Sequence, residues 1–502
     1  MKIHLKKSQK KPLKIHLKQS LQPMKNSIIY IRQSNSDLYQ EHFTCEQGIT
    51  LYQALLSHGY ELSGATCAGA GVCRGCMVII AEEGMECLAC RYQIHTEELH
   101  VQILSMIPHQ HILLLESDSE QSADQSADQL SAQNPQVHNI NNIHDCAMAV
   151  DIGTTTIASA IVDLHTKKIV AQAGCMNHQA VYGGDVISRI QYACEHENGL
   201  EQMTSLLWDD IDSLLEFYDT QGIDKSSIRD IQCVGNTTML HFLLGHDVNS
   251  LAFYPFSSDL LSPMTIQHNS TTVRTAAGRS PFVGSDITVG AAVLDLGSSD
   301  SYDLLIDLGT NGELCLLNRE KGVCTSTSCG PAFANSVMNG NAYGSTLLDL
   351  LSEHYLNGNV DETGLLKEPY FETGMICGEY VITQDTIRQI QLAKSAICTG
   401  IELAAYELKL PLTDIANVYL AGGFGFHLNP DSAFHLGLFP EALKGRIHIV
   451  GNTALKGAVR LLTDPSFSSK TESVLAKCGV MDLSMNKNFQ EFFLHRLNFP
   501  VF

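Results

Sequence analysis

A chain of 502 residues is long enough for two to four domains, each with its own core. The net charge of −22 argues against a nucleic-acid partner, because phosphates require a basic protein surface. The sequence contains no apolar run of about 18 residues, so we expect no membrane span. Sixteen cysteines without an apolar secretion signal are typical of the reducing cytoplasm, where disulfide frameworks are rare.

The start of the chain is the exception to the acidic composition. Residues 1–26 contain eight lysines and no acidic residue, and the sequence Lys-Ile-His-Leu-Lys occurs twice among them. A signal peptide would need an apolar central stretch, which this segment lacks. We therefore expect a disordered basic tail, or a chain whose ordinary start is Met24.

Residues 27–115 have the pattern of a small α+β domain. The segments with β character are residues 28–32, 77–81 and 99–104. Residues 49–59 have helical spacing and end on a glycine, which is a common helix stop. The expected order is strand, strand, helix, long loop, strand, strand, and only the second strand is not assigned to particular residues.

The composition then changes twice along the chain. Residues 116–145 consist mainly of Ser, Asp, Gln, Asn and Ala. Such a stretch cannot bury enough apolar surface to offset the entropy lost on ordering, so it is predicted to be a flexible linker. From residue 146 to about 490 strands alternate with helical segments, which predicts α/β architecture.

An internal repeat runs through this α/β part. The sequence AVDIGTTT at residues 149–156 is echoed by LIDLGTNG at residues 305–312. The sequence VGNTTML at residues 234–240 is echoed by VGNTALK at residues 450–456. Paired echoes so far apart predict two related halves that face one another.

Five cysteines gather between residues 67 and 90. Their spacing is Cys67-x5-Cys73-x2-Cys76, followed by Cys87 and Cys90. Four thiolates bind a [2Fe–2S] cluster, and the glycines among them let backbone N–H groups approach the sulfurs. A zinc site made of two Cys-x2-Cys pairs is the alternative, but it leaves one cysteine and the glycine density unexplained.

Two short turns after apolar strands indicate a nucleotide site. Asp151 and Asp307 each end a strand and precede a Gly-Thr pair, so their carboxylates are placed to hold Mg²⁺ beside phosphate. A single Asp-x-Gly-Thr turn is a weak signal, whereas two with matched strands are a strong one. The candidate phosphate-binding residues are Gly153, Thr154, Thr155, Thr156, Gly309, Thr310, Asn311 and Gly312.

A third glycine-rich turn completes the pattern. Residues 418–421 form a strand that runs into Gly422 and Gly423. Ligands of α/β sheets bind outside the carboxyl ends of strands, and glycine leaves the backbone bare there. These two glycines are candidates for contact with a nucleoside.

The three turns resemble the phosphate-1, phosphate-2 and adenosine motifs of the actin/Hsp70/sugar-kinase superfamily, over about residues 146–465. The resemblance implies a C-terminal two-lobed, ribonuclease-H-like ATPase domain at residues 146–490. It also implies that Asp151 and Asp307 organise Mg²⁺ and the attacking water, while Gly422 and Gly423 contact the nucleoside of ATP.

The cysteine loop GATCAGAGVCRGC and the later LAC resemble the plant- and adrenodoxin-type ferredoxins. This resemblance implies an N-terminal β-grasp [2Fe–2S] domain with Cys67, Cys73, Cys76 and Cys90 as ligands. The interval between Cys76 and the closing cysteine is shorter than in most such ferredoxins, so Cys87 stays open as the fourth ligand.

Further segments, in the order in which one family of this superfamily has them, make the resemblance more specific. They are GGDVISRI at 183–190, VGNTT at 234–238, GPAF at 330–333, ITQ at 382–384 and LAK at 392–394. With the ferredoxin ahead of them, the chain resembles the reductive activators of corrinoid proteins. The resemblance implies a cytoplasmic, homodimeric enzyme that consumes ATP to pass an electron through a [2Fe–2S] cluster. The acceptor is the Co(II) corrinoid of a methyltransferase-system protein, which returns to Co(I), and a low-potential donor supplies the electron.

Two other functions stay open at this point. A [2Fe–2S] electron carrier with a nucleotide-sensing module is favoured by Ala334 and Asn335, which stand where the family tends to have Glu-Gly. An activator of another low-potential or radical enzyme would use the same superfamily. The chain has no Asp-x-His-x-x-Gly run to ligate cobalt, so the corrinoid is expected to belong to the partner.

Overall fold

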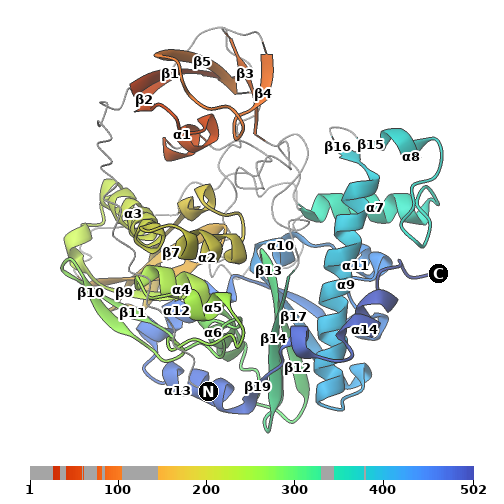
Figure 1. Ribbon diagram of the computed structural model, residues 1–502. Coiled ribbons are helices and arrows are strands. Elements are labelled where there is room, and N and C mark those ends of the chain that lie inside the picture. Colours follow the sequence, from red (N-terminus) through yellow and green to blue (C-terminus); the bar gives the residue numbers. More distant parts are fainter. Residues whose placement is uncertain are drawn as a thin grey trace, which may run out of the picture.

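The computed structural model describes residues 26–33, 41–58, 60, 76–81, 85–103, 145–328, 344–377 and 380–501. Several expectations fall outside these residues: the basic tail up to residue 25, the linker at residues 116–144, Cys67, Cys73, Ala334 and Asn335. The described part comprises a small N-terminal domain and two larger lobes (Figure 1).

The N-terminal domain is a five-stranded sheet with one helix. Its elements are β1 (Asn26–Gln33), β2 (Glu41–Glu46), α1 (Leu51–Ser57), β3 (Met77–Ile80), β4 (Met85–Leu88) and β5 (Glu98–Ile103). The strand order is β2-β1-β5-β3-β4, with β1 and β5 parallel and the other neighbours antiparallel. Leu51 and Leu55 of α1 share one core with Ile29 and Val101 of the sheet, so the helix covers one face. Sequence patterning found the other elements but not β4.

Lobe I contains the first six-stranded sheet of the C-terminal part. Its strands are β6 (Cys146–Ile152), β7 (Thr156–Asp163), β8 (Lys168–Met176), β9 (Ile228–Gly235), β10 (Thr265–His268) and β11 (Thr271–Thr275), in the order β10-β11-β9-β6-β7-β8. The helical elements are η2 (His178–Val181), α2 (Val186–Glu195), α3 (Gly199–Thr220), η3 (Lys225–Ser227), α4 (Thr237–Leu243), α5 (Asn249–Ala252) and α6 (Ser285–Val293). One face of the sheet packs against α3 and α4.

Lobe II contains the second six-stranded sheet. Its strands are β12 (Tyr302–Leu308), β13 (Asn311–Leu317), β14 (Gly322–Ser328), β17 (Ile415–Ala421), β18 (Ile447–Gly451) and β19 (Cys478–Val480), in the order β18-β17-β12-β13-β14-β19. Its helical elements are α7 (Gly344–Leu356), α8 (Tyr370–Thr373), α9 (Gln384–Glu407), η5 (Leu412–Asp414), α10 (Gly422–His427), α11 (Pro430–Leu436), η6 (Glu441–Leu443), η7 (Leu483–Met485) and α14 (Phe489–His495). A two-stranded sheet of β15 (Met375–Cys377) and β16 (Tyr380–Ile382) lies between α8 and α9 in the chain.

The two sheets share one topology. In each, an antiparallel three-strand meander (β6-β7-β8 or β12-β13-β14) is extended by two parallel strands, β9 and β11 or β17 and β18. The turns at residues 151–156 and 307–312 therefore occupy equivalent places, as the repeat predicted. The two VGNT segments do not occupy equivalent places in the two sheets, because the first follows β9 and the second follows β18. The latter strand corresponds to β11.

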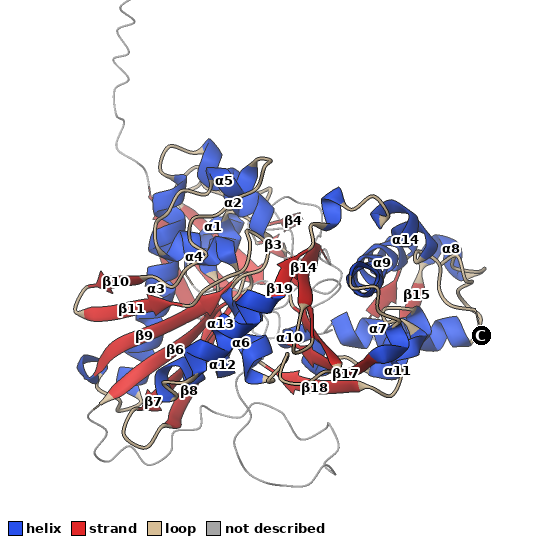
Figure 2. Cartoon of the chain, turned by 90° about the horizontal axis from the view of Figure 1, so that it is seen from below, coloured by secondary structure: helices blue, strands red, loops and turns tan. Residues whose placement is uncertain are grey.

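A third core joins the lobes. Helices α6, α12 (Thr453–Thr463) and α13 (Phe467–Lys477) lie between the two sheets (Figure 2). Small residues of the first sheet, such as Ala149 and Ala160, let the helices pack closely on it. The chain thus passes from lobe I to lobe II through α6 and returns against lobe I through α12.

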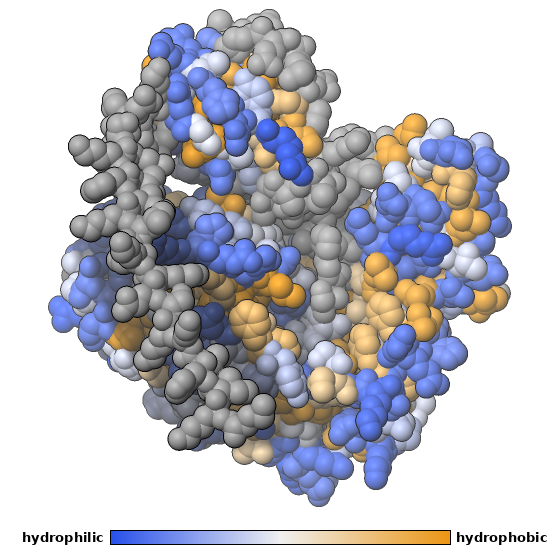
Figure 3. Space-filling view, in the orientation of Figure 1, coloured by the Kyte–Doolittle hydropathy of each residue, from blue (hydrophilic) through white to orange (hydrophobic). Residues whose placement is uncertain are grey.

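The face seen in Figure 3 is hydrophilic over much of both lobes, with hydrophobic side chains gathered on lobe II near α9 and α14. Leu392 of α9 and Leu494 of α14 are among the large hydrophobic side chains that are more than half exposed. In the part of the chain that the structure describes, no helix is both long and apolar enough to span a membrane.

Candidate functional site

The period-two alternation of side chains places both predicted aspartates on the side of each sheet that faces the other lobe. Along β6, Met148 and Val150 point into the outer core of lobe I, whereas Ala149 packs in the core between the lobes. Asp151, two residues beyond Ala149, shares that inner face. In the same way Asp307 of β12 shares a face with Leu305, which also packs between the lobes.

The first turn connects β6 to β7 in a very tight bend. The N–H of Gly153 donates to the carbonyl of Thr156 at 3.0 Å. A Cβ atom on Gly153 would lie 2.7 Å from that carbonyl oxygen, so only glycine fits. Thr154 is buried behind the turn, whereas Thr155 and Thr156 keep partial exposure.

Three asparagine side chains hold this turn. Asn177 Nδ2 donates to the carbonyl of Gly153 at 2.9 Å, and Asn236 Nδ2 donates to Thr154 Oγ1 at 3.1 Å. Asn452 Nδ2 donates to Asp151 Oδ2 at 3.0 Å. The turn is therefore fixed by amide donors from three separate elements.

The second turn connects β12 to β13 and has different neighbours. The N–H of Gly309 donates to the carbonyl of Asn311 at 3.0 Å, while Gly312 pairs with Leu308 in the ladder. Thr310 Oγ1 lies 2.8 Å from Thr155 Oγ1, so the two turns meet through their threonine hydroxyls. The structure therefore brings both predicted phosphate turns together.

Two further carboxylates complete the arrangement, and sequence patterning did not select either of them. Glu313 lies directly opposite Asp307 across β12 and β13, and Ser326 of β14 is opposite Glu313. Asp286 lies in the first turn of α6, the helix that crosses between the sheets. The sequence could have indicated Glu313 as a site residue, because it directly follows the second turn motif. No motif in the sequence around Asp286 indicates a role for that residue.

Desolvation raises the pKa values of all four carboxyl groups, and repulsion between carboxylates adds to the shifts of Asp151, Asp307 and Glu313. Desolvation, with repulsion from Asp286, raises the pKa of Asp151 to about 7, and the amide of Asn452 opposes that shift. The same causes, with Asp151 added, raise the pKa of Asp307 to about 8. Desolvation raises the pKa of Asp286 to about 6 and that of Glu313 well above its ordinary value. The site therefore favours a bound cation or retained protons.

The chemistry of this set fits Mg²⁺ held together with phosphate. In the described residues no group of three or more His, Cys, Asp and Glu side chains is placed to hold a metal ion by itself. Mg²⁺ usually keeps several waters and binds through one or two carboxylates plus substrate phosphates. Asp151 and Asp307 are partly exposed, so such a ligand can reach them.

The glycines of the third turn differ in what surrounds them. Gly422 has φ +84°, and a Cβ there would lie 2.4 Å from Asp307 Oδ1 and 2.5 Å from the carbonyl of Leu308. Gly422 is thus required for close packing against the second turn. Gly423 is exposed with no atom within 4 Å of its Cβ position, which leaves open backbone at the end of β17.

Two of the predicted cluster ligands lie in the described residues, at one end of the β3-β4 hairpin. Cys76 directly precedes β3, and the N–H of Ala89 donates to its carbonyl at 2.8 Å, which brings the adjacent Cys90 to the same end. Both cysteines are buried. Cys87 lies inside β4 opposite Val78, one residue pair in from that end of the hairpin. Both Cys87 and Cys90 thus lie near this end, and Cys90 as the closing ligand stays a prediction.

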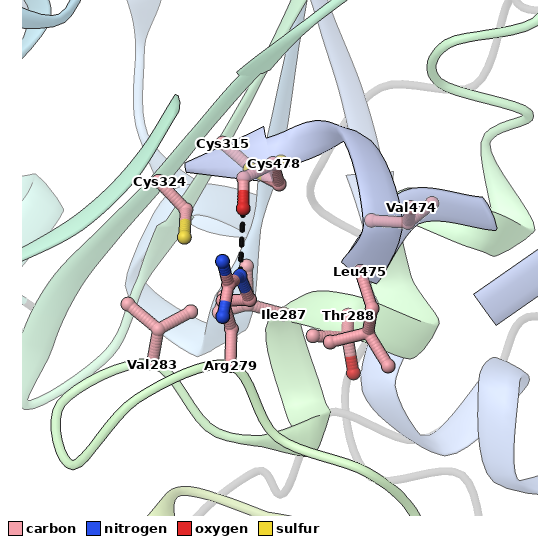
Figure 4. A pocket seen from close by; sticks show the side chains of 9 residues that line it. All are labelled: Arg279, Val283, Ile287, Thr288, Cys315, Cys324, Val474, Leu475 and Cys478. Atoms are coloured by element: carbon pink, nitrogen blue, oxygen red, sulfur yellow. Dashed lines mark hydrogen bonds between the residues drawn. The ribbon is translucent and has the colours of Figure 1, made fainter. Parts of the chain in front are cut away.

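A small cavity elsewhere in the protein is separate from this site. It lies beside α6 and has a volume of about 10 Å³, which is room for one water molecule. Its lining includes Cys315, Cys324 and Cys478, with Arg279 Nε donating to the carbonyl of Cys478 at 2.6 Å (Figure 4). None of the four carboxylates lines it.

The two related lobes and their paired aspartate turns define a protein of the ASKHA class, the actin-like ATPase fold. Residues 146–299 match the family model described as the RACo middle region. Residues 301–342 and 341–501 match the model described as the C-terminal domain of RACo, the ASKHA domain. The two models together span most of the chain, and it belongs to this family, the reductive activators of corrinoid proteins.

Individual relatives agree with this assignment. The corrinoid activation enzyme RamQ of Eubacterium limosum is 27% identical over an alignment of 377 residues, and the match covers 62% of this chain and 63% of RamQ. The chain therefore matches less than two thirds of that relative's length. A solved structure of a reductive activator for a corrinoid iron-sulfur protein has a TM-score of 0.66 at 24% identity. The alignment covers 94% of this chain and 98% of that one, and it shows a shared fold.

Proposed function

We propose that the protein uses ATP to reduce the Co(II) corrinoid of a partner protein to Co(I). The single observation that carries this proposal is the meeting of two aspartate turns from related lobes, Thr155 against Thr310, in a member of the RACo family. The relative RamQ is named as a corrinoid activation enzyme, which supports a corrinoid protein as the partner. We propose a corrinoid protein of a methyltransferase system, with a separate low-potential donor.

The two lobes provide the nucleotide part of this function. Asp151 and Asp307 would hold Mg²⁺, each from its own lobe, and Asp286 and Glu313 lie close enough to influence their charge. Bound Mg²⁺ supplies charge neutralisation for the phosphates.

The turn residues Gly153, Thr154, Thr155, Thr156, Gly309, Thr310, Asn311 and Gly312 would provide N–H and hydroxyl donors to phosphate oxygens. Asp307 would orient the attacking water, and the open backbone at Gly423 would face the nucleoside, with Gly422 holding the third turn against the second.

The N-terminal domain provides the redox part. The order β2-β1-β5-β3-β4 with parallel β1 and β5 under one helix supports a β-grasp ferredoxin domain. Cys76 and Cys90 share one end of the β3-β4 hairpin and would hold the cluster together with Cys67 and Cys73. A [2Fe–2S] cluster bound there supplies one-electron transfer at low potential.

The remaining parts of the proposal follow from the predictions on the sequence. The domains are a basic tail at 1–26, a ferredoxin domain at 27–115, a linker at 116–145 and the ATPase domain at 146–490. In the structure the chain packs on lobe II beyond residue 490, where Arg496 pairs with Glu402 of α9. We propose a cytoplasmic homodimer that binds neither nucleic acid nor membrane.

An anaerobic titration tests the proposal directly. The purified protein, a low-potential reductant and a Co(II) corrinoid protein are mixed with and without Mg-ATP, and Co(I) absorbance is followed. We expect Co(I) only with ATP in the wild-type protein, and none with Cys90→Ser or Asp307→Ala. Cys87→Ser is the matched control and should keep the reducible cluster.

Two outcomes would contradict the proposal. Cobalt that stays Co(II) throughout, despite an intact reducible cluster, would favour activation of a different low-potential enzyme. Tight ATP binding with negligible hydrolysis would favour an electron carrier that senses nucleotide. Loss of the cluster in Cys87→Ser but not in Cys90→Ser would reassign the fourth ligand without affecting the nucleotide part.

A further inference from the structure

The three asparagines around the first turn share one bonding pattern. Each side chain caps a helix through its Oδ1 atom and donates its Nδ2 hydrogens to the turn. Asn177 caps η2 at the N–H of Gln179, and Asn236 caps α4 at the N–H of Met239. Asn452 caps α12 at the N–H of Leu455, with a distance of 2.8 Å. An amide suits both tasks because it carries an acceptor and a donor on one planar group.

Asn452 differs from the other two in where it originates. Asn177 follows β8 and Asn236 follows β9, so both belong to lobe I and would move with the first turn. Asn452 follows β18, which pairs with β17 in the sheet of lobe II. Its bond to Asp151 is therefore a side-chain contact between the chain leaving one lobe and the carboxylate of the other.

The atom that Asn452 contacts also differs. Asn177 and Asn236 bind a carbonyl and a hydroxyl behind the turn. Asn452 binds a carboxylate oxygen of Asp151 itself, and hydrogen bonds to a charged group are stronger than neutral ones. Because Asp286 repels this carboxylate from nearby, a fixed donor on Oδ2 restrains which way the group points.

We propose that Asn452 is a positioning residue that orients the Asp151 carboxylate for magnesium nucleotide from the lobe II side. This inference rests on the proposed function, because it assumes that Asp151 acts on Mg²⁺. As a consequence, the Asp151 carboxylate keeps this orientation only while the connection from β18 to α12, which contains Asn452, stays packed against lobe I. Movement between the lobes would then change metal affinity as well as turn geometry.

The variant Asn452→Ser separates the two tasks of the side chain. Serine caps helices about as well as asparagine, so the start of α12 is kept. Its hydroxyl is too short to reach the carboxylate that the asparagine amide reaches. Asn452→Thr is a second neutral capping variant in case the first one folds poorly. Asn429→Ser is the matched control, because Asn429 caps α11 at the N–H of Asp431 on the surface, far along the chain from either turn.

Two readouts distinguish positioning from a structural role. Binding of Mn²⁺ in the presence of a non-hydrolysable ATP analogue is measured by electron paramagnetic resonance, and ATP hydrolysis is measured as a function of Mg²⁺ concentration. Loss of one hydrogen bond to a charged group corresponds to about a tenfold change or more. We expect Asn452→Ser to raise the Mn²⁺ dissociation constant and the half-saturating Mg²⁺ about tenfold. At saturating Mg²⁺ its kcat should stay within about threefold of wild type, and thermal unfolding should confirm a folded protein.

The outcomes separate this inference from the function on which it rests. If Asn452→Ser and Asn452→Thr bind Mn²⁺ as tightly as Asn429→Ser does, Asn452 does not position Asp151, whereas the proposed function stands. If kcat falls with no change in the metal requirement, the residue acts only through the fold and the inference is overturned. If the wild-type protein itself binds no Mn²⁺ with nucleotide, the proposed function fails first.

Discussion

The turns at Asp151 and Asp307 have the same sequence motif and the same place in their sheets, but different residues surround them. Both end a strand on the inner face of a sheet and both continue into Gly-Thr. The first is surrounded by amide donors, of which Asn452 reaches the carboxylate itself. The second is surrounded by carboxylates, since Glu313 is its cross-strand neighbour and Asp286 repels it.

This difference accounts for the order of the two pKa values. The carboxyl of Asp151 is repelled by Asp286 but receives an amide hydrogen bond, and its pKa is raised to about 7. The carboxyl of Asp307 is repelled by Asp286 and by Asp151, and its pKa is raised to about 8. The second turn therefore has the greater need for a cation, whereas the first is already oriented by the protein.

Removing each carboxylate in turn gives the largest expected effect. Asp307→Asn and Asp151→Asn should each lower ATP hydrolysis by about 100-fold or more, because each removes charge that faces the metal and phosphates. In the ligand-free protein both changes should raise the melting temperature, and Asp307→Asn should raise it more, because that carboxylate is repelled by two neighbours. Steady-state hydrolysis and thermal unfolding measure these outcomes. Activity within threefold of wild type, or the reverse order of melting temperatures, would contradict the comparison.

The third turn tests how tightly the second one is packed. Gly422→Ala places a Cβ against Asp307 at positive φ, and it should lower the free energy of unfolding by about 2 kcal/mol or more. Gly423→Ala meets open space and should change that free energy by less than about 1 kcal/mol, while weakening nucleotide binding. Urea denaturation and nucleotide titration separate the two. Equal destabilisation by both variants would show that Gly422 is not the packing residue.

The raised pKa values predict how pH affects the site. At pH 5 to 6 the folded protein retains protons on Asp151 and Asp307 that the unfolded chain has released, since ordinary aspartate has a pKa near 3.8. Their contribution to stability is therefore full below about pH 4 and is lost as pH rises through 7 to 8. A bound magnesium nucleotide offsets this loss, so the thermal shift it produces should grow from pH 6 to pH 8.

Calorimetry provides the matching control for this pH effect. Binding of magnesium nucleotide near pH 7 should release protons, which titrations in two buffers of different ionisation enthalpy can count. Asp307→Asn should release fewer protons than the wild-type protein. A thermal shift that is independent of pH, with no proton release, would mean that the carboxyl groups are already ionised in the free protein.

The contact between the two turns should give the smallest effect. Thr155 and Thr310 share a hydroxyl hydrogen bond at 2.8 Å, and both residues are partly exposed. A double-mutant cycle with Thr155→Val and Thr310→Val should give a coupling energy of about 1 kcal/mol or less in the free energy of unfolding. A larger coupling would mean that this bond, rather than the helices between the sheets, holds the lobes together.

Much of the fold and part of the site could be predicted from local patterns. Each Asp-x-Gly-Thr turn, the strand before Gly422 and the cysteine loop are local signals, because each is encoded within one short stretch of the chain. The N-terminal strands and helix followed from alternation and helical spacing. β4 (Met85–Leu88) was not predicted, because it contains no β-branched or aromatic residue, whereas the equally short β3 is rich in them.

The VGNT echoes show where a local signal is incomplete. The sequence identified both segments and suggested equivalent places in two halves, but β9 and β18 are not equivalent strands. Their asparagines nevertheless converge on one turn, Asn236 at Thr154 and Asn452 at Asp151. The packing of α12 against lobe I brings Asn452 to the same turn as Asn236, and the sequence does not predict that packing.

By itself the sequence determined the chemistry that the chain can offer: two aspartate turns, a glycine turn and a set of thiols, each encoded by neighbouring residues. The tertiary structure decided which of these groups act together. Asp286 and Asn452 join the site because α6 and α12 cross between the sheets, and Glu313 joins because strand register sets it opposite Asp307. Contacts between residues so far apart depend on helix packing and register, for which a single sequence contains no local pattern.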